Sequence, residues 1–167
     1  MSRTVSTLLV TAVAIAAVFS GCSTKKRPEH RAQQVGKDVY KVRTTAYSHL
    51  ENEPGAPWKK TAAGTKLRYG KITSAAADWS RFPLGTKFKL LKTGRVYEIE
   101  DYGSALVGTD TVDLYMPRLR MMNDWGVRHV EIKILEWGSY EKSADILKHR
   151  TKYKHCRQMY QEIQKKL

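Results

Sequence analysis

The feature that most constrains the fold is a series of short segments rich in β-branched and aromatic residues, each followed by a turn signal. They occupy residues 42–47, 66–69, 87–91, 95–99 and 129–135. The last alternates apolar and charged side chains, as a strand with one buried face does. Glycines separate the segments, and regular short strands with many glycines are typical of a small barrel. We therefore expect residues 41–136 to form an all-β barrel with one short helix at 117–124, since proline suits a first helical turn.

The N-terminus has the pattern of an export signal. Arg3 precedes an apolar run over residues 8–19, which is too short for a comfortable membrane span. The run ends in Phe19-Ser20-Gly21-Cys22, which resembles the lipobox of bacterial lipoproteins. We expect residues 1–21 to be a lipoprotein signal peptide, Cys22 to carry the lipid and residues 22–40 to form a flexible tether. An ordinary cleaved signal and a retained anchor are the alternatives.

These expectations place the protein outside the cytoplasm. It is expected to be an exported bacterial lipoprotein that faces the periplasm, and Ser23 after Cys22 would permit sorting to the outer membrane. If Cys22 is acylated, Cys156 is the one remaining thiol of the sequence and has no partner for an internal disulfide.

The formal charge is +14, but most of the excess positive charge lies on either side of a middle segment whose charges nearly balance. That distribution does not predict a nucleic-acid partner.

Residues 137–167 differ in kind from the rest. Apolar residues recur there at a spacing of three and four, as on one stripe of a helix: Tyr153, Cys156, Tyr160, Ile163 and Leu167. Lysines and arginines occupy the other faces of that helix. We expect a basic amphipathic C-terminal helix that packs on the barrel. Contact of residues 139–167 with a membrane surface or a partner protein is the alternative.

Carboxylates are the best candidates for chemistry. The sequence has no phosphate-binding Gly-x-x-x-x-Gly-Lys loop and no Gly-x-Ser-x-Gly elbow, and its histidines and cysteines do not cluster, so we expect neither a cofactor nor a metal. Asp113 lies between apolar residues, which predicts a raised pKa and a carboxyl able to donate a proton near neutral pH. Asp78 and Asp101 stand beside turns, and each could instead bind turn amides.

The order of these motifs resembles the three-aspartate (3D) domain over residues 43–135. That domain also forms the catalytic barrel of membrane-bound lytic transglycosylase A and of stationary-phase survival muralytic proteins. The resemblance rests on Thr45-Ala46-Tyr47, Thr61-Ala62-Ala63-Gly64-Thr65, Tyr69-Gly70, Asp78, Pro83-Leu84-Gly85-Thr86, Glu100-Asp101, Gly103, Ala105, Gly108, Val112-Asp113-Leu114-Tyr115, Trp125-Gly126 and Val130-x-Ile132. It implies a six-stranded double-psi β-barrel. The usual Asp-Thr-Gly-Gly-Ala-Ile reads Asp101-Tyr102-Gly103-Ser104-Ala105-Leu106 here, and the loop before Asp113 is one residue longer than usual.

The resemblance implies a lytic transglycosylase that acts on peptidoglycan glycan strands. Such an enzyme cleaves the bond between N-acetylmuramic acid and N-acetylglucosamine without water and leaves a 1,6-anhydro end. Asp113 matches the general acid and base, Asp101 its hydrogen-bonding partner and Asp78 a supporting residue. Sugar contacts are expected from Tyr47, Tyr102, Gly103 and Ser104, with Trp58 and Trp79 as further stacking candidates.

Two other functions remain open at this point. The barrel could bind glycan without cutting it and tether the membrane to the cell wall as a lipoprotein. It could also hydrolyse the strand through an Asp101–Asp113 pair, which would release reducing ends instead of anhydro ends.

Overall fold

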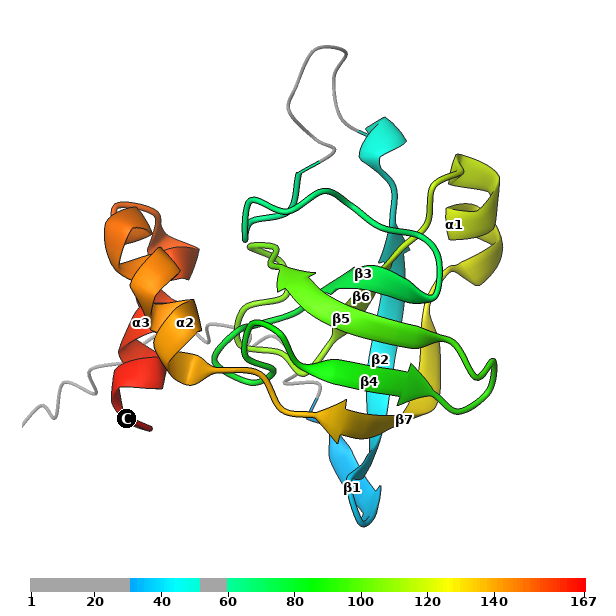
Figure 1. Cartoon of the computed structure of the whole chain (residues 1–167), viewed down its shortest axis with the longest axis horizontal. Helices are drawn as coiled ribbons and strands as arrows, with labels where there is room; N and C mark the ends of the chain where they lie inside the picture. The colour runs from blue at the N-terminus through cyan, green and yellow to red at the C-terminus, as the bar shows by residue number, and fades with distance from the viewer. Residues whose placement is uncertain (1–30, 52–59) are drawn as a thin grey trace, which may run out of the picture.

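A computed structural model of the chain describes residues 31–51 and 60–167 (Figure 1). The expected signal peptide, Cys22 and Trp58 lie outside these residues. In chain order the strands are β1 (Gln33–Gly36), β2 (Val39–Tyr47), β3 (Ile72–Ala76), β4 (Lys87–Leu90), β5 (Val96–Asp101), β6 (Val112–Tyr115) and β7 (Arg128–Glu136). The α-helices are α1 (Leu119–Trp125), α2 (Tyr140–Leu147) and α3 (Lys154–Gln164), and single 3-10 turns are η1 (His49–Glu51) and η2 (Lys148–Arg150).

Six strands close into a ring that is not evenly round, which confirms the all-β barrel. The order around it is β2-β6-β3-β5-β4-β7, and β7 pairs again with β2. β1 adds a short antiparallel strand beside β2. The pairs β2–β6 and β3–β5 are parallel, whereas the other pairs of the ring are antiparallel. The ring has two halves, β2–β4 and β5–β7. If β2 is exchanged with β5, β3 with β6 and β4 with β7, the same set of pairings results. The two halves are therefore related by a pseudo-two-fold arrangement, as expected for a double-psi barrel.

The core of the barrel follows from strand alternation. Side chains at every second position point inward, and the largest of these are fully buried, among them Phe88, Leu90, Ile99, Leu114 and Ile132. Phe88 on β4 stacks on Tyr97 of β5 at a ring distance of 5.4 Å. The outer faces of the strands, which point away from this core, can therefore carry polar and ionisable side chains.

Two strand expectations differ from the structure. Residues 66–69 form no strand beyond an isolated bridge between Lys60 and Lys66. β3 was not expected, because most of its residues are small: Thr73, Ser74, Ala75 and Ala76. These four are buried between β5 and β6, where small side chains leave room for larger neighbours.

Residues 22–40 were expected to be a tether, yet Gln33–Gly36 form β1, because the start of β2 offers an unpaired edge to it.

The segment after β7 is helical, as expected, but it is not one helix: residues 140–164 form a helical hairpin of α2 and α3, joined through η2. Cys156 and Ile163 of the expected apolar stripe are buried, together with Met159, which was not expected. Tyr153, at the N-cap, and Leu167, beyond the end of α3, are exposed. The hairpin lies on the opposite side of the barrel from α1 (Figure 1). No helix among the described residues has the length and apolar character needed to cross a bilayer.

The hairpin is fixed to the barrel at the turn that precedes β4. Ser139 donates its backbone N–H to the carbonyl oxygen of Leu84 (3.0 Å), and the Leu84 N–H donates to Ser143 Oγ (2.9 Å). Gly138 approaches so closely that a Cβ atom there would lie 2.2 Å from the oxygen of Leu84. The Lys166 ammonium donates to the carbonyl oxygen of Ser80. The hairpin is therefore a part of the folded domain.

Candidate active site

The parallel pair β2–β6 presents four polar and aromatic side chains on its outer face. Thr45 stands in register with Asp113, and Tyr47 stands in register with Tyr115. Because side chains two residues apart share a face of a strand, these four form one block. The intervening residues, such as Leu114, point into the core. The block lies where β2 ends and runs into η1 (Figure 1).

Asp113 is the central carboxyl of this block. Thr45 Oγ1 donates to Asp113 Oδ1 at 2.7 Å. The pKa of Asp113 is raised from 3.8 to about 6, mainly by burial and also by the negative charges of Glu51 and Asp101. The Thr45 hydrogen bond and the Arg43 guanidinium oppose that rise. The expected raised pKa is thus confirmed, and the carboxyl can hold and release a proton near neutral pH.

Asp101 lies on the same side of the sheet, two strands away. Ala76 of β3 pairs with Asp113 on one side and with Asp101 on the other. An irregularity at Ala75–Ala76 places Asp101 rather than Glu100 in that register. Since neighbouring strands are about 4.8 Å apart, the two aspartates lie about 10 Å apart along the sheet at the backbone.

The Asp101 carboxylate has its own partners. Its Oδ1 accepts the backbone N–H groups of Ala62 and Tyr102, each at 2.9 Å. Burial raises the pKa of Asp101, while these two hydrogen bonds and the nearby Arg150 guanidinium lower it. Asp101 is therefore held in a fixed orientation by the loop that contains Ala62.

Tyr47 supplies a polar group without a partner. Its hydroxyl is buried and makes no hydrogen bond to any described residue. Burial raises its pKa well above 10, and the charges of Asp101 and Asp113 add to the rise. Tyr47 thus lies close enough to both carboxyls for their charges to change its pKa. A buried hydroxyl that lacks a partner is costly, so it is a natural contact for a polar ligand.

The site also contains three residues that were not expected from the sequence: Tyr115, His49 and Glu51. The Tyr115 hydroxyl bonds to His49 Nδ1 at 2.8 Å, and Glu51 Oε2 accepts the N–H of Ser48 at 2.9 Å. The period-two pattern of β6 could have indicated Tyr115, which follows Asp113 by two residues. His49 and Glu51 carry no comparable signal, because η1 brings them to the site by folding back over the end of β2.

Asp78 and Trp79 are placed in the framework. Asp78 is buried; its Oδ1 accepts the N–H and hydroxyl of Ser80, and its Oδ2 accepts the N–H of Gly108 at 2.7 Å. It therefore ties two loops together. Trp79 is fully buried and donates its Nε1–H to the carbonyl oxygen of Asp101 at 2.9 Å. A sugar cannot stack on a ring in this position, so the stacking expectation for Trp79 is wrong.

Residues 73–136 match the family model described as the 3D domain. This segment is a 3D domain. It contains Asp78, Asp101 and Asp113, and the domain is found in lytic transglycosylase-like and other cell-wall proteins. No curated protein matches the chain. The match leaves β2 and the C-terminal hairpin outside, although both touch the site.

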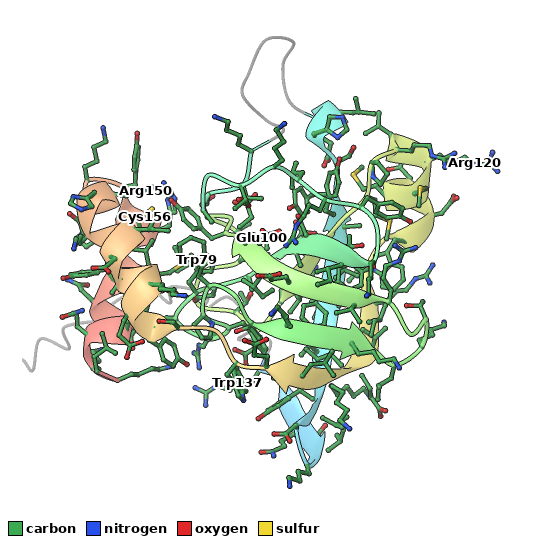
Figure 2. The ribbon with its side chains drawn as sticks, viewed as in Figure 1. Trp79, Glu100, Arg120, Trp137, Arg150 and Cys156 are labelled. Carbon is green, nitrogen blue, oxygen red and sulfur yellow. The ribbon has the colours of Figure 1, made fainter. Side chains whose placement is uncertain are left out.

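One departure from the usual 3D pattern, Tyr102, has a physical reason in the hairpin. The ring of Tyr102 packs edge-on against Trp79 at 4.9 Å. Its hydroxyl accepts from Arg150 Nη1 (3.0 Å) and from Cys156 Sγ (3.2 Å). In Figure 2 Arg150 and Cys156 lie on the hairpin toward the barrel, near Trp79. Tyr102 therefore anchors the hairpin to the 3D domain through its side chain.

Arg150 also reaches the loop that holds Asp101. Its Nη1 donates to the carbonyl oxygen of Ala62 at 2.9 Å, while the Ala62 N–H binds the Asp101 carboxylate. Gly103 and Ser104 follow in the adjacent turn, and Ser104 is exposed. Over residues 31–51 and 60–167, no three His, Cys, Asp or Glu side chains gather as a metal site requires.

Proposed function

We propose that this protein is a peptidoglycan lytic transglycosylase in which Asp113 acts first as general acid and then as general base. The observation that carries the proposal is the state of Asp113: a largely buried carboxyl with a pKa of about 6 in a 3D domain. At pH 7 a group of pKa 6 is protonated in about one tenth of the molecules. That fraction is sufficient for a general acid whose conjugate base must also act.

The proposed reaction needs one proton to move twice. Asp113 donates its proton to the glycosidic oxygen, and the bond from that oxygen to the anomeric carbon of the muramic sugar breaks. The Asp113 carboxylate then removes the proton of the C6 hydroxyl, whose oxygen bonds to the same anomeric carbon. Asp113 ends as it began, and no water is consumed. The hydrogen bond from Thr45 stabilises the carboxylate between the two transfers.

Asp101 and Tyr47 fit supporting roles. The charge of Asp101 helps to keep the pKa of Asp113 high, and its fixed carboxylate can accept hydrogen bonds from sugar hydroxyls. The unpartnered Tyr47 hydroxyl can bind the sugar or the carboxylate that forms. Gly103, Ser104 and the Tyr102 backbone complete the proposed substrate contacts.

The position of the two aspartates also supports a second candidate. Asp101 and Asp113 stand on either side of Ala76, and inverting hydrolases place two carboxyls about 6.5–9.5 Å apart with a water between them. Hydrolysis through this pair would leave a reducing end. The chemistry of the products therefore separates the two reactions.

We further propose that the protein works as an exported lipoprotein. Acylation of Cys22 would hold it on the periplasmic face of a membrane, with outer-membrane sorting permitted by Ser23. Residues 22–32 would then link the lipid to β1. The basic hairpin, residues 139–167, would face the membrane or a partner protein.

Product analysis tests the proposed activity. Purified protein is incubated with isolated peptidoglycan, and the soluble fragments are examined by mass spectrometry. We expect anhydro-muropeptides from the wild type, loss of at least about 100-fold in Asp113→Asn, and wild-type activity in Asp124→Asn, whose carboxyl is exposed on α1. Reducing ends would indicate hydrolysis. Absence of release by a protein that still sediments with peptidoglycan would favour a binding lipoprotein.

A further inference from the structure

A small basic pocket lies on the outer face of β2, apart from the aspartates. Its volume is about 180 Å³, and its lining comes from the start of β1, from β2 and from β7: Arg31, Gln33, Lys41, Arg43 and His129. This volume suits a carboxylate with its nearest atoms, and it is too small for a disaccharide.

Strand pairing explains why these side chains meet. Lys41 and Arg43 alternate with the buried Val42, so both point outward from β2. Lys41 stands in register with Gln33 of β1, and Arg43 stands in register with His129 of β7. The three strands thus deliver their outward side chains to one place.

The charge of the pocket favours an anion. Arg43 makes one long hydrogen bond, from Nη1 to Thr111 Oγ1 (3.4 Å), and a guanidinium has five N–H donors. Glu131 of β7 stands in register with Lys41 and is exposed to solvent, so it opposes the charge of that lysine. Asp110 accepts the N–H of Ala32 and pairs with Arg81. The lysine and the arginine therefore outweigh the acidic groups that face them.

The pocket is continuous in sequence and on the strand with the candidate acid. Lys41, Arg43 and Thr45 share the outer face of β2, and Thr45 binds Asp113. At about 3.3 Å per residue, Arg43 lies about 7 Å and Lys41 about 13 Å along β2 from Thr45. A substituent of a sugar bound over Asp113 can span these distances.

We infer that this pocket binds a carboxylate of the peptide stem carried by the muramic sugar whose glycosidic bond is cut. The inference rests on the proposed function, and it adds a substrate preference: the protein acts on glycan strands that still carry peptide stems. A strand without stems keeps only the lactyl carboxylate, close to the ring of each muramic sugar. The stem carries its carboxylates further from the ring, toward the distance at which Arg43 and Lys41 lie from Thr45.

The test compares two substrates. Glycan strands whose peptide stems have free carboxyls and the same strands with those carboxyls amidated are offered to the same full-length protein, and kcat/KM is measured for each. We expect the wild type to prefer the strands with free stem carboxyls by about tenfold, as one charge-assisted hydrogen bond allows. Lys41→Gln and Arg43→Gln should each reduce this preference several-fold. Lys92→Gln, an exposed lysine in the β4–β5 turn, should preserve it.

Using the ratio of the two substrates removes any general effect of Arg43 on the acid, because that effect is common to both. Equal kcat/KM values for the two substrates in the wild type would overturn the inference and leave the proposed activity intact. Failure to cut either substrate would contradict the proposed activity instead.

A binding measurement tests the pocket without any turnover. An N-acetylmuramyl peptide with free carboxyl groups is titrated into the Asp113→Asn protein, and the backbone amides of residues 41–43 are followed by NMR. We expect saturable shifts that are lost when the carboxyls of the ligand are amidated. Equal shifts with both ligands, or none with either, would overturn the inference.

Discussion

Replacing Thr45 with valine removes one hydrogen bond from the proposed acid and nearly preserves the shape of the side chain. Thr45 Oγ1 donates to Asp113 Oδ1 at 2.7 Å, and this bond favours the carboxylate over the neutral acid. Its loss therefore raises the pKa of Asp113 above the present value of about 6. The substitution changes the acid without removing it.

The size of the change follows from the bond. Hydrogen bonds to charged groups contribute about 1.5–3 kcal/mol, and about 1.4 kcal/mol corresponds to one pKa unit. We use the lower end because water can partly replace the lost donor, so the pKa should rise by about one unit. The protonated fraction at pH 7 would then increase from about one tenth to about one half.

The pH profile of kcat/KM measures this shift. Because the protonated acid starts the reaction, kcat/KM falls as the pH rises through the pKa of Asp113. The wild-type profile should fall by half near pH 6, and that of Thr45→Val near pH 7. The kcat/KM of the variant should therefore exceed that of the wild type at pH 8. Thr45→Ser keeps the hydroxyl and should follow the wild type.

A profile of Thr45→Val that coincides with that of the wild type would refute the reasoning. Either Asp113 would not be the group that titrates, or the hydrogen bond would not set its pKa. A uniform loss at every pH, with the midpoint unchanged, would assign Thr45 a positioning role alone.

Three further outcomes are expected. The pKa of Asp113 is higher in the fold than its ordinary 3.8, so the carboxylate destabilises the fold increasingly as the pH rises from about 4 to 6. In urea unfolding at pH 7, Asp113→Asn should be more stable than the wild type by up to about 3 kcal/mol. Below pH 4 the two proteins should have the same free energy of unfolding. Gly138→Ala meets backbone atoms within 2.6 Å and should lower the free energy of unfolding by about 1–3 kcal/mol or more, while Gly70→Ala, with no atom within 4 Å of the added Cβ, should change it little; equal values for the two would contradict the packing argument. Arg150→Met removes a positive charge near Asp101 and should raise the pKa of that carboxyl further in an NMR titration; an unchanged value would show that Arg150 acts on the loop alone.

The pKa of Asp113 shows how a sequence argument can reach the right result for an incomplete reason. The flanking Val112 and Leu114 predicted burial of the carboxyl. In the structure both of these point into the barrel, on the opposite face from Asp113. The carboxyl is buried instead by what surrounds it on the outer face of β2 and β6, where Thr45 and Tyr47 come from a strand about 68 residues earlier in the chain.

Tyr102 shows the opposite case, in which a departure from a family pattern could not be interpreted from the sequence. Its partners Arg150 and Cys156 belong to the hairpin, about 50 residues away, and the sequence predicted one helix there where the structure has two. Without the turn at η2, Arg150 could not be placed next to Tyr102.

The local features of this protein could be predicted from its amino-acid sequence. Alternation marked most strands, turn residues separated them, Pro117 preceded α1, and the ordered motifs around Asp78, Asp101 and Asp113 indicated the 3D domain. These features depend on residues close together in the chain. The tertiary structure alone decided that Asp101 and Asp113 flank Ala76, that Tyr47 lies near both, and that Lys41 and Arg43 share a face with Thr45. Closing the ring pairs strands that are not consecutive in the chain, and the register shift opposite Ala75–Ala76, which skips Glu100, decides which carboxyl enters the site.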